Sequence, residues 1–128
     1  NRTNDIDVFY QQAMLVGALG TNGRPAIPLL LNALTNTHPV IHAHALIALG
    51  MVGSEPERCV LAILPFIAPT NGLGARQKAA FAMAAFAEKS ELAEKALLTA
   101  KGDPDPYVRR VAEGALKRAQ KKQPSPSS

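Results

Sequence analysis

Three histidines come closest to the spacing of a metal site in this sequence. His38 and His42 are four residues apart, so on a helix they would share one face, a common arrangement of zinc ligands. His44 follows two residues later and would point to another face. No Cys, Asp or Glu lies close by in the sequence to complete a coordination shell. We therefore expect these histidines to make surface or loop contacts, and we predict neither a metal site nor a cofactor.

Residues that could carry acid–base, nucleophilic or phosphate chemistry have simpler roles. Asp5 and Asp7 suit the positive end of the dipole of a first helix, and residues 88–95 form a mixed-charge helical surface. Residues 72–74 (Gly-Leu-Gly) follow no strand and are too short to cradle a phosphate. The single cysteine, Cys59, excludes an internal disulfide, and its aliphatic neighbours indicate a buried thiol. We predict no catalytic residue and no enzyme activity.

Basic residues gather near the C-terminus and could in principle contact nucleic acid. The formal net charge is +4. Its main contributors at this end are Arg109, Arg110, Lys117, Arg118, Lys121 and Lys122. A nucleic-acid surface needs basic residues on several elements and aromatic groups to meet the bases, whereas here the charge is at one end and Trp is missing. A polar outer helix that ends a helical array has the same composition, so nucleic-acid binding is not expected.

The composition is that of one helical domain. The 128 residues are 47% hydrophobic but only 5% aromatic, and Ala and Leu favour helices that approach each other closely. No apolar run reaches the roughly 20 residues of a membrane span, and no targeting segment is visible at the N-terminus. Because the chain starts without Met, we expect a piece of a longer parent with further repeats or domains. The compartment is undetermined, with the cytoplasm as the expectation.

Apolar residues spaced i, i+3, i+4, i+7 predict an all-α protein of seven helices. Their expected ranges are 5–19, 24–35, 39–53, 55–67, 74–88, 90–101 and 106–121. Segments rich in Gly, Pro and Asn separate them. Ser90 and Ser54 are expected as N-caps, Ser54 in a capping box with Glu57. Pro65 is expected to bend or end its helix.

The sequence repeats itself at intervals of about 33 to 34 residues. The first helices align with Ala45, Ala79 and Ala112 in one column, then Ala48, Ala82 and Ala115, then Leu49, Met83 and Leu116. One period earlier, Val8, Leu15, Val16 and Gly20 stand opposite Ile41, Ala48, Leu49 and Gly53. The second helices align Ile27, Leu30, Leu31 and Leu34 with Val60, Ile63, Leu64 and Ile67, and with Ala93, Ala96, Leu97 and Ala100. Because one helical pair cannot bury its apolar face alone, the pairs must stack.

Residues 103–116 (DPDPYVRRVAEGAL) resemble the signature of the short HEAT-like repeats named after phycobilisome (bilin) lyases, and residues 38–50 resemble a degraded copy. The resemblance covers nearly the whole chain except its end. It implies an α-solenoid, a right-handed superhelix of about 3.5 HEAT-like helical-hairpin repeats. We assign residues 1–122 to this domain and expect residues 123–128 to be a disordered Pro/Ser-rich tail.

The resemblance also implies a structural pairing between a loop aspartate and an arginine of the helix that follows. Asp103 or Asp105 would pair with Arg109 or Arg110. The copy at Gly74 lacks both the acidic loop and the Val-Arg pair, so this pairing is expected to be broken in the middle repeat.

Arrays of this family act mostly as scaffolds or adaptors, so the resemblance implies a non-catalytic protein–protein interaction module with a protein partner. A fragment of a HEAT-like bilin lyase, another HEAT-fold enzyme, or a nucleic-acid-binding HEAT-like module are the alternatives, because fold alone does not decide function. In HEAT-type arrays the second helices line the concave, partner-binding side. Their apolar non-core positions predict a groove there, unless these side chains pack under a loop or on missing repeats. The candidate partner-binding residues are Leu29, Asn32, Arg58, Leu61, Phe66 and Lys95.

Overall fold

The structure is a computed structural model that describes residues 2–36 and 38–122, with side chains described for residues 5–36 and 38–121. Over these residues the chain forms seven α-helices, one 3-10 helix and no strand, which confirms the all-α prediction. The elements are α1 (Arg2–Ala18), η1 (Gly20–Ala26), α2 (Ile27–Ala33), α3 (Pro39–Val52), α4 (Pro56–Ile67), α5 (Leu73–Ala84), α6 (Glu91–Ala100) and α7 (Pro106–Lys122). The predicted disordered tail, 123–128, lies outside the described residues.

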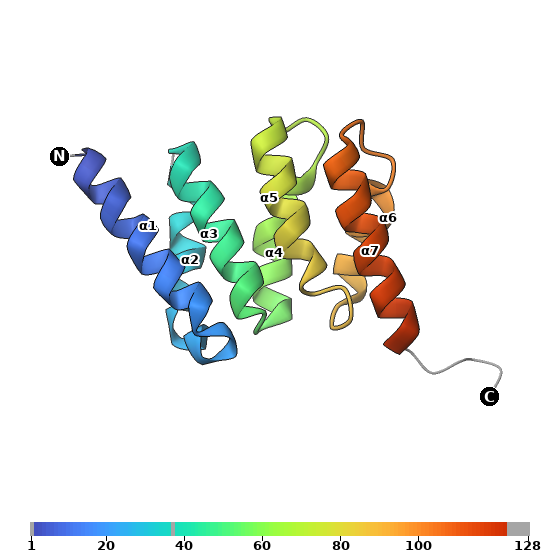
Figure 1. The fold of residues 1–128 in the computed structure, drawn as a ribbon, viewed down its shortest axis with the longest axis horizontal. Coiled ribbons are helices and arrows are strands. Elements are labelled where there is room, and N and C mark those ends of the chain that lie inside the picture. The colour runs from blue at the N-terminus through green and yellow to red at the C-terminus, as the bar shows by residue number, and fades with distance from the viewer. Residues whose placement is uncertain (1, 37, 123–128) are drawn as a thin grey trace.

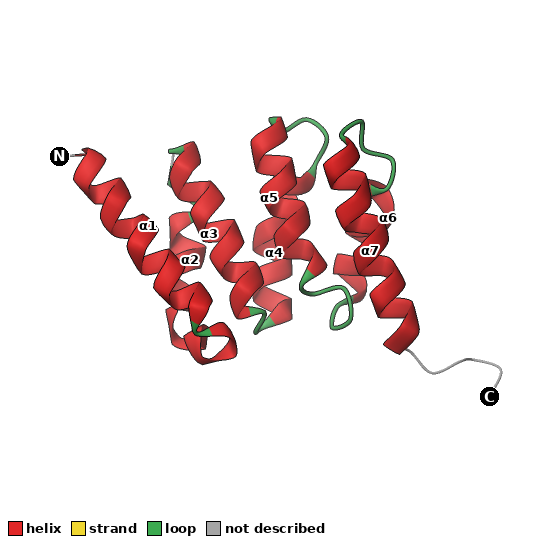
Figure 2. Ribbon diagram, viewed as in Figure 1, coloured by secondary structure: helices red, strands yellow, loops and turns green. Residues whose placement is uncertain are grey.

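The helices are arranged in two layers (Figure 1). A front layer holds α1, α3, α5 and α7 side by side, and α2, α4 and α6 form a back layer. Each back helix packs against the next front helix, and α4 also packs against α6, whereas α2 and α4 make little direct contact. Loops join the helices at both ends of the layers (Figure 2). Such packing is that of a helical bundle or repeat. Within the part of the chain that the structure describes, no helix is long and apolar enough to cross a membrane.

The aligned columns of small and aliphatic residues are buried in the core. They comprise Ala45, Ala79 and Ala112, Ala48, Ala82 and Ala115, and Leu49, Met83 and Leu116. Small residues also set the distance between front helices. A Cβ atom on Gly50 of α3 would lie 2.8 Å from the Cα atom of Ala82 in α5. On α1, a Cβ atom on Gly17 would lie 2.8 Å from the Sδ atom of Met51. Glycine therefore permits the close approach of neighbouring helices at both positions.

The first helix keeps the predicted register at its end but is less buried than the helices aligned with it. Gly20 and Gly53 both have positive φ, 57° and 63°, and each follows the end of a front helix. Ala13 is buried like Leu46 one period later, whereas Val8 and Leu15 are 52% and 69% exposed. The reason is positional, because α1 is covered by α3 on one flank only among the described elements.

Two predicted helices differ in their bounds. The segment expected as one helix over 24–35 begins as the 3-10 helix η1, with Pro25 inside it, and becomes α-helical only at Ile27. The helix expected to end at residue 88 ends at Ala84, because the chain turns there and buries Phe86 completely. The same turn lets Lys89 donate from Nζ to the Gly53 carbonyl oxygen at 2.7 Å.

The predicted helix ends are confirmed at one cap and wrong at another. Ser90 caps α6, since its hydroxyl accepts a hydrogen bond from the backbone N–H of Ala93 at 3.1 Å. Ser54 does not cap α4, because Glu55 occupies the N-cap position with a left-handed φ of 54° and no capping side-chain bond. Pro65 lies within the last turn of α4, which ends two residues later, at Ile67, as predicted.

We predict that Gly50→Ala lowers the free energy of unfolding by about 1–3 kcal/mol, because its Cβ atom would press on the backbone of Ala82. Urea denaturation followed by circular dichroism measures the effect. Gly74→Ala in α5 is the control, because its Cβ atom would meet nothing within 4 Å and should leave stability equal or higher. Equal stability of the Gly50→Ala and Gly74→Ala variants would contradict the close packing of α3 on α5.

Candidate functional site

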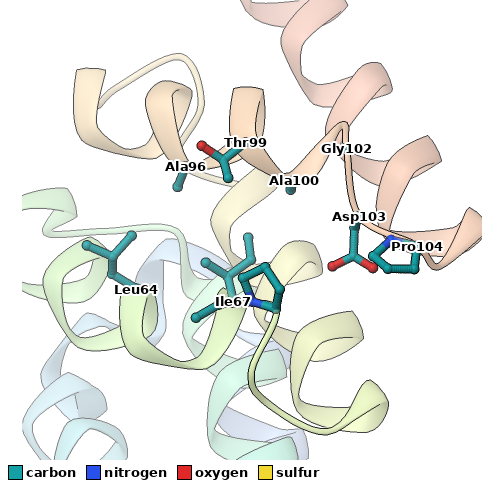
Figure 3. Close-up of a pocket in the computed structure, with 10 residues that line it drawn as sticks. Leu64, Ile67, Ala96, Thr99, Ala100, Gly102, Asp103 and Pro104 are labelled. Carbon is teal, nitrogen blue, oxygen red and sulfur yellow. The ribbon is translucent and has the colours of Figure 1, made fainter.

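A cleft of about 460 Å³ opens between α4 and α6 in the back layer, beside the loops that lead into α5 and α7. Figure 3 shows Leu64 and Ile67 on the α4 side, with Ala96 and Ala100 on the α6 side. Asp103 lies at the edge formed by the loop before α7. The remaining lining residues are Ala68, Pro69, Thr99, Gly102 and Pro104. The cleft is therefore almost entirely apolar.

The cleft exists because α6 carries short side chains where the other back helices carry long ones. Leu64 and Ile67 of α4 belong to columns that recur along the sequence. In the same set of columns α6 has alanine at residues 93, 96 and 100. Methyl groups cannot fill the volume that leucine or isoleucine would occupy, so space remains between the two helices. Residues predicted as core thus also form the wall of the cleft.

None of the six residues predicted to bind a partner lines this cleft. Leu29 and Asn32 of α2 lie together at a separate hollow of about 400 Å³ formed with α1. Leu61 of α4 is 63% exposed, and Lys95 of α6 is also exposed. The sequence placed the partner-binding surface on the back layer, but the α4–α6 cleft of that layer is lined by other residues.

Two of the predicted residues are already engaged by neighbours. Phe66 is half-buried and packs edge-on against the His42 ring, with centroids 5.3 Å apart. Arg58 donates from Nη1 to Glu55 Oε1 at 2.9 Å. This hydrogen bond, with a second from Arg24, lowers the pKa of the Glu55 carboxyl group against the opposing effect of desolvation.

The strongest electrostatic feature at the cleft is the ion pair between Arg76 and Asp103. Arg76 donates from Nε to Oδ2 at 3.0 Å and from Nη2 to Oδ1 at 3.3 Å. The side chains are only 13% and 2% exposed. The third nitrogen, Nη1, donates to the Asn71 carbonyl oxygen at 2.6 Å. The pair ties the start of α5 to the loop before α7 and to the loop after α4.

This pair corrects two expectations. The side chain of Asp103 pairs with Arg76 of the middle repeat, whereas Arg109 donates to the backbone carbonyl oxygens of Asp103 and Pro104 at 2.9 and 2.8 Å. The middle repeat is also not broken, since Arg76 takes the position that Arg109 has in the last repeat. The alignment already placed Ala75 opposite Val108. The next residues, Arg76 and Arg109, therefore share a column, and this shared arginine was the signal that sequence reasoning missed.

Asp105 forms the second polar contact between α5 and the loop before α7. Its Oδ2 atom accepts hydrogen bonds from Gln77 Nε2 at 3.2 Å and from the Val108 backbone N–H at 3.0 Å. Desolvation opposes the ionised carboxylate, but these hydrogen bonds, with one from the Tyr107 backbone, outweigh it and lower the pKa of Asp105.

The histidine segment repeats the geometry of this loop. Asn36 Oδ1 accepts from the His38 backbone N–H at 2.8 Å, as Asp103 Oδ1 accepts from the Asp105 backbone N–H at 2.8 Å. The imidazole Nε2 of His42 bonds the Asn36 carbonyl oxygen, which is the contact that Arg109 makes with the Asp103 carbonyl. His38 also caps α3, because its Nδ1 accepts from the backbone N–H of residue 40. The first two histidines therefore make loop contacts, as expected.

The remaining titratable candidates are packed rather than poised for chemistry. His44 packs edge-on against Tyr10, with ring centroids 4.5 Å apart. Burial and the nearby Lys78 ammonium lower the pKa of its imidazole. Cys59 is fully buried, as predicted, and burial raises the pKa of its thiol to about 11. Among residues 2–36 and 38–122, no group of three His, Cys, Asp or Glu side chains could hold a metal ion.

Comparison of the chain with protein-family models, with curated proteins and with solved structures found no match.

We predict that Asp103→Ala lowers the free energy of unfolding by about 3 kcal/mol, because it leaves the partly buried Arg76 guanidinium without its carboxylate. Arg76→Met should lower the free energy of unfolding much less in the Asp103→Ala background than in the wild type, because the two side chains act as a pair. Urea denaturation of the four proteins of this cycle gives the coupling. If the two losses in unfolding free energy simply add, Arg76 and Asp103 do not stabilise the fold as a pair.

We predict that Asp105 makes stability depend on pH. Its pKa is lower in the folded state, so its contribution is present above the unfolded value of about 3.9 and is lost as pH falls through the folded pKa. Asp105→Asn should therefore flatten the fall of the urea midpoint as the pH drops below about 5. Glu113→Gln, at an exposed position on α7, is the control. An equal flattening in that control would remove Asp105 as the cause.

Proposed function

We propose that the protein is a non-catalytic protein-interaction module, built as an α-solenoid of about 3.5 HEAT-like hairpins in a right-handed superhelix. Three observations support the repeat architecture. The helices form two layers in which each hairpin packs against the next. The three aligned columns of α3, α5 and α7 are buried in all three helices. The hydrogen bonds of the loop at Asn36 recur in the loop at Asp103.

The observation that carries the proposed function is the apolar α4–α6 cleft on the back layer. Four aliphatic side chains, from residues 64, 67, 96 and 100, form its two walls. Each back helix also exposes leucine: Leu29 on α2, Leu61 on α4, and Leu92 and Leu98 on α6, at 53%, 63%, 36% and 52%. An apolar cleft flanked by exposed leucines is typical of a protein-binding face.

The polar side chains in the cleft support a protein partner over a small polar substrate. Asp103 is held by Arg76, and the Thr99 hydroxyl donates to the Lys95 carbonyl oxygen at 3.4 Å. A small-molecule site usually offers convergent polar groups that fix the ligand's orientation. In this cleft the polar side chains serve the protein's own structure, so recognition depends on apolar shape.

The test fills the cleft without adding charge. Ala96→Leu should weaken binding of a native partner by about tenfold or more, because the new side chain occupies the space that a partner side chain would enter. Crosslinking capture from native extract identifies the partner, and calorimetry with the purified partner gives the Kd. Ala18→Leu, at an exposed position of the front layer, is the matched control.

A second variant addresses the exposed leucines without risk to the core. Leu61→Asp changes a side chain that is 63% exposed, so the fold should persist while partner affinity falls. Full affinity in both Ala96→Leu and Leu61→Asp would contradict a back-layer interface. A visible chromophore that is retained after coexpression and lost in Ala96→Leu would favour the bilin-handling alternative instead.

A further inference from the structure

A second groove, of about 450 Å³, lies between α5 and α7 in the front layer. Its apolar part is formed by Phe81 and Ala84 of α5 and by Val111 and Gly114 of α7. Arg110, Arg118, Ala85 and Glu88 complete its lining. Two arginines and one glutamate therefore line the groove beside its apolar part.

The groove is open because a large side chain is missing from one repeat position. Gly114 occupies the column that holds Ile47 in α3 and Phe81 in α5. Between α3 and α5 the space is filled, since the Phe81 ring lies 3.4 Å from where a Cβ atom on Gly50 would be. Between α5 and α7 no equivalent ring exists, because the position has no side chain.

Helix packing does not require glycine at this position. A Cβ atom on Gly114 would meet a single neighbour within 4 Å, the flexible Nη1 end of Arg118 at 3.4 Å. By contrast, the Cβ atom on Gly50 would press on backbone. Glycine within a helix is less favourable than alanine, so Gly114 weakens α7 with no gain in packing. What the glycine provides is a hollow in the surface.

The two arginines bracket this hollow along one face of α7. Residues 110, 114 and 118 follow the spacing i, i+4, i+8, which places them on one side of the helix over about 12 Å. Arg110 and Arg118 are exposed, and neither belongs to the ion pairs found among the described residues. Arg110 therefore lies one turn before Gly114, and Arg118 lies one turn after it with its movable guanidinium end beside the glycine.

We propose that the α5–α7 groove binds an acidic amphipathic helix of a partner protein, with one apolar side chain seated over Gly114. Acidic residues about two turns apart on that helix would meet Arg110 and Arg118. Two neighbouring front helices form a groove of the kind that accepts a helix, and charge complementarity selects an acidic one. Phosphates of a nucleic acid would make no use of the apolar floor. The groove is on the opposite layer from the α4–α6 cleft, so it does not depend on the function proposed above.

The test uses a fluorescently labelled helical peptide of about 20 residues, long enough to be helical, with leucines on one face and glutamates beside them. We expect it to bind the full chain, and Gly114→Leu to weaken its Kd by about tenfold or more. A peptide of the same composition in scrambled order is the control for charge alone. Equal binding of both peptides, or an unchanged Kd for Gly114→Leu, would overturn the proposal.

Gly114→Ala separates the groove from helix packing. Its melting temperature should equal or exceed that of the wild type, because alanine favours the helix and meets only a movable side chain. A lower melting temperature would show that glycine is needed for packing and would remove the basis of the proposal. This measurement keeps the proposal testable even if Gly114→Leu fails to fold.

The charges are tested by a matched pair of double variants. Arg110→Glu with Arg118→Glu should weaken peptide binding by about tenfold or more. Lys101→Glu with Lys117→Glu makes the same change of net charge at exposed positions that do not line the groove, and should change the Kd less than twofold by comparison. Equal losses in both would indicate general attraction and contradict the groove. Tighter binding of a single-stranded oligonucleotide, unaffected by Gly114→Leu, would assign the basic surface to nucleic acid instead.

Discussion

The buried ion pair between Arg76 and Asp103 is the contact on which the C-terminal half of the structure depends. A carboxylate that is 2% exposed is tolerated only when its charge is compensated, and here two nitrogens of one guanidinium meet it. Since Arg76 also holds Asn71, one side chain fixes the loops before α5 and before α7. These loops supply one end of the α4–α6 cleft, through residues 68–69 and 102–104. The contact that joins the last two hairpins therefore also shapes the candidate binding surface.

Small residues have two opposite effects in this fold. Where they lie between helices, as at Gly50 and in the buried alanine columns, they let backbones approach and the core is filled. Where a small residue replaces a large one at the edge of a column, the volume stays empty. Ala96 and Ala100 leave the cleft in the back layer, and Gly114 leaves the groove in the front layer. Both hollows therefore lie in the C-terminal half, where α6 has alanines and α7 has a glycine at positions that hold larger side chains in the preceding helices.

The helices and most core columns were predictable, because burial imposes the helical period on the sequence. Three features were not. The Arg76–Asp103 pair joins residues 27 apart, and a loop signature suggests only partners nearby in sequence. The exposure of Leu15 depends on which flanks of α1 are covered, which an alignment cannot tell. The cleft, finally, is defined by missing volume. Sequence patterns mark side chains that are present and cannot mark empty volume. For this reason the sequence pointed to exposed positions such as Leu61, whereas the cleft is lined by residues that had been assigned to the core.

The two surfaces differ in the physical chemistry by which they could select a partner. In the cleft the charged group, Asp103, is buried and paired, so binding there depends on apolar area and is nearly insensitive to salt. In the α5–α7 groove, Arg110 and Arg118 are exposed to solvent, so their attraction for an acidic partner is screened as ionic strength rises. Because the surfaces lie on opposite layers, one partner bound in either leaves the other accessible. Under the two proposals above, the chain would join two chemically different partners through opposite layers.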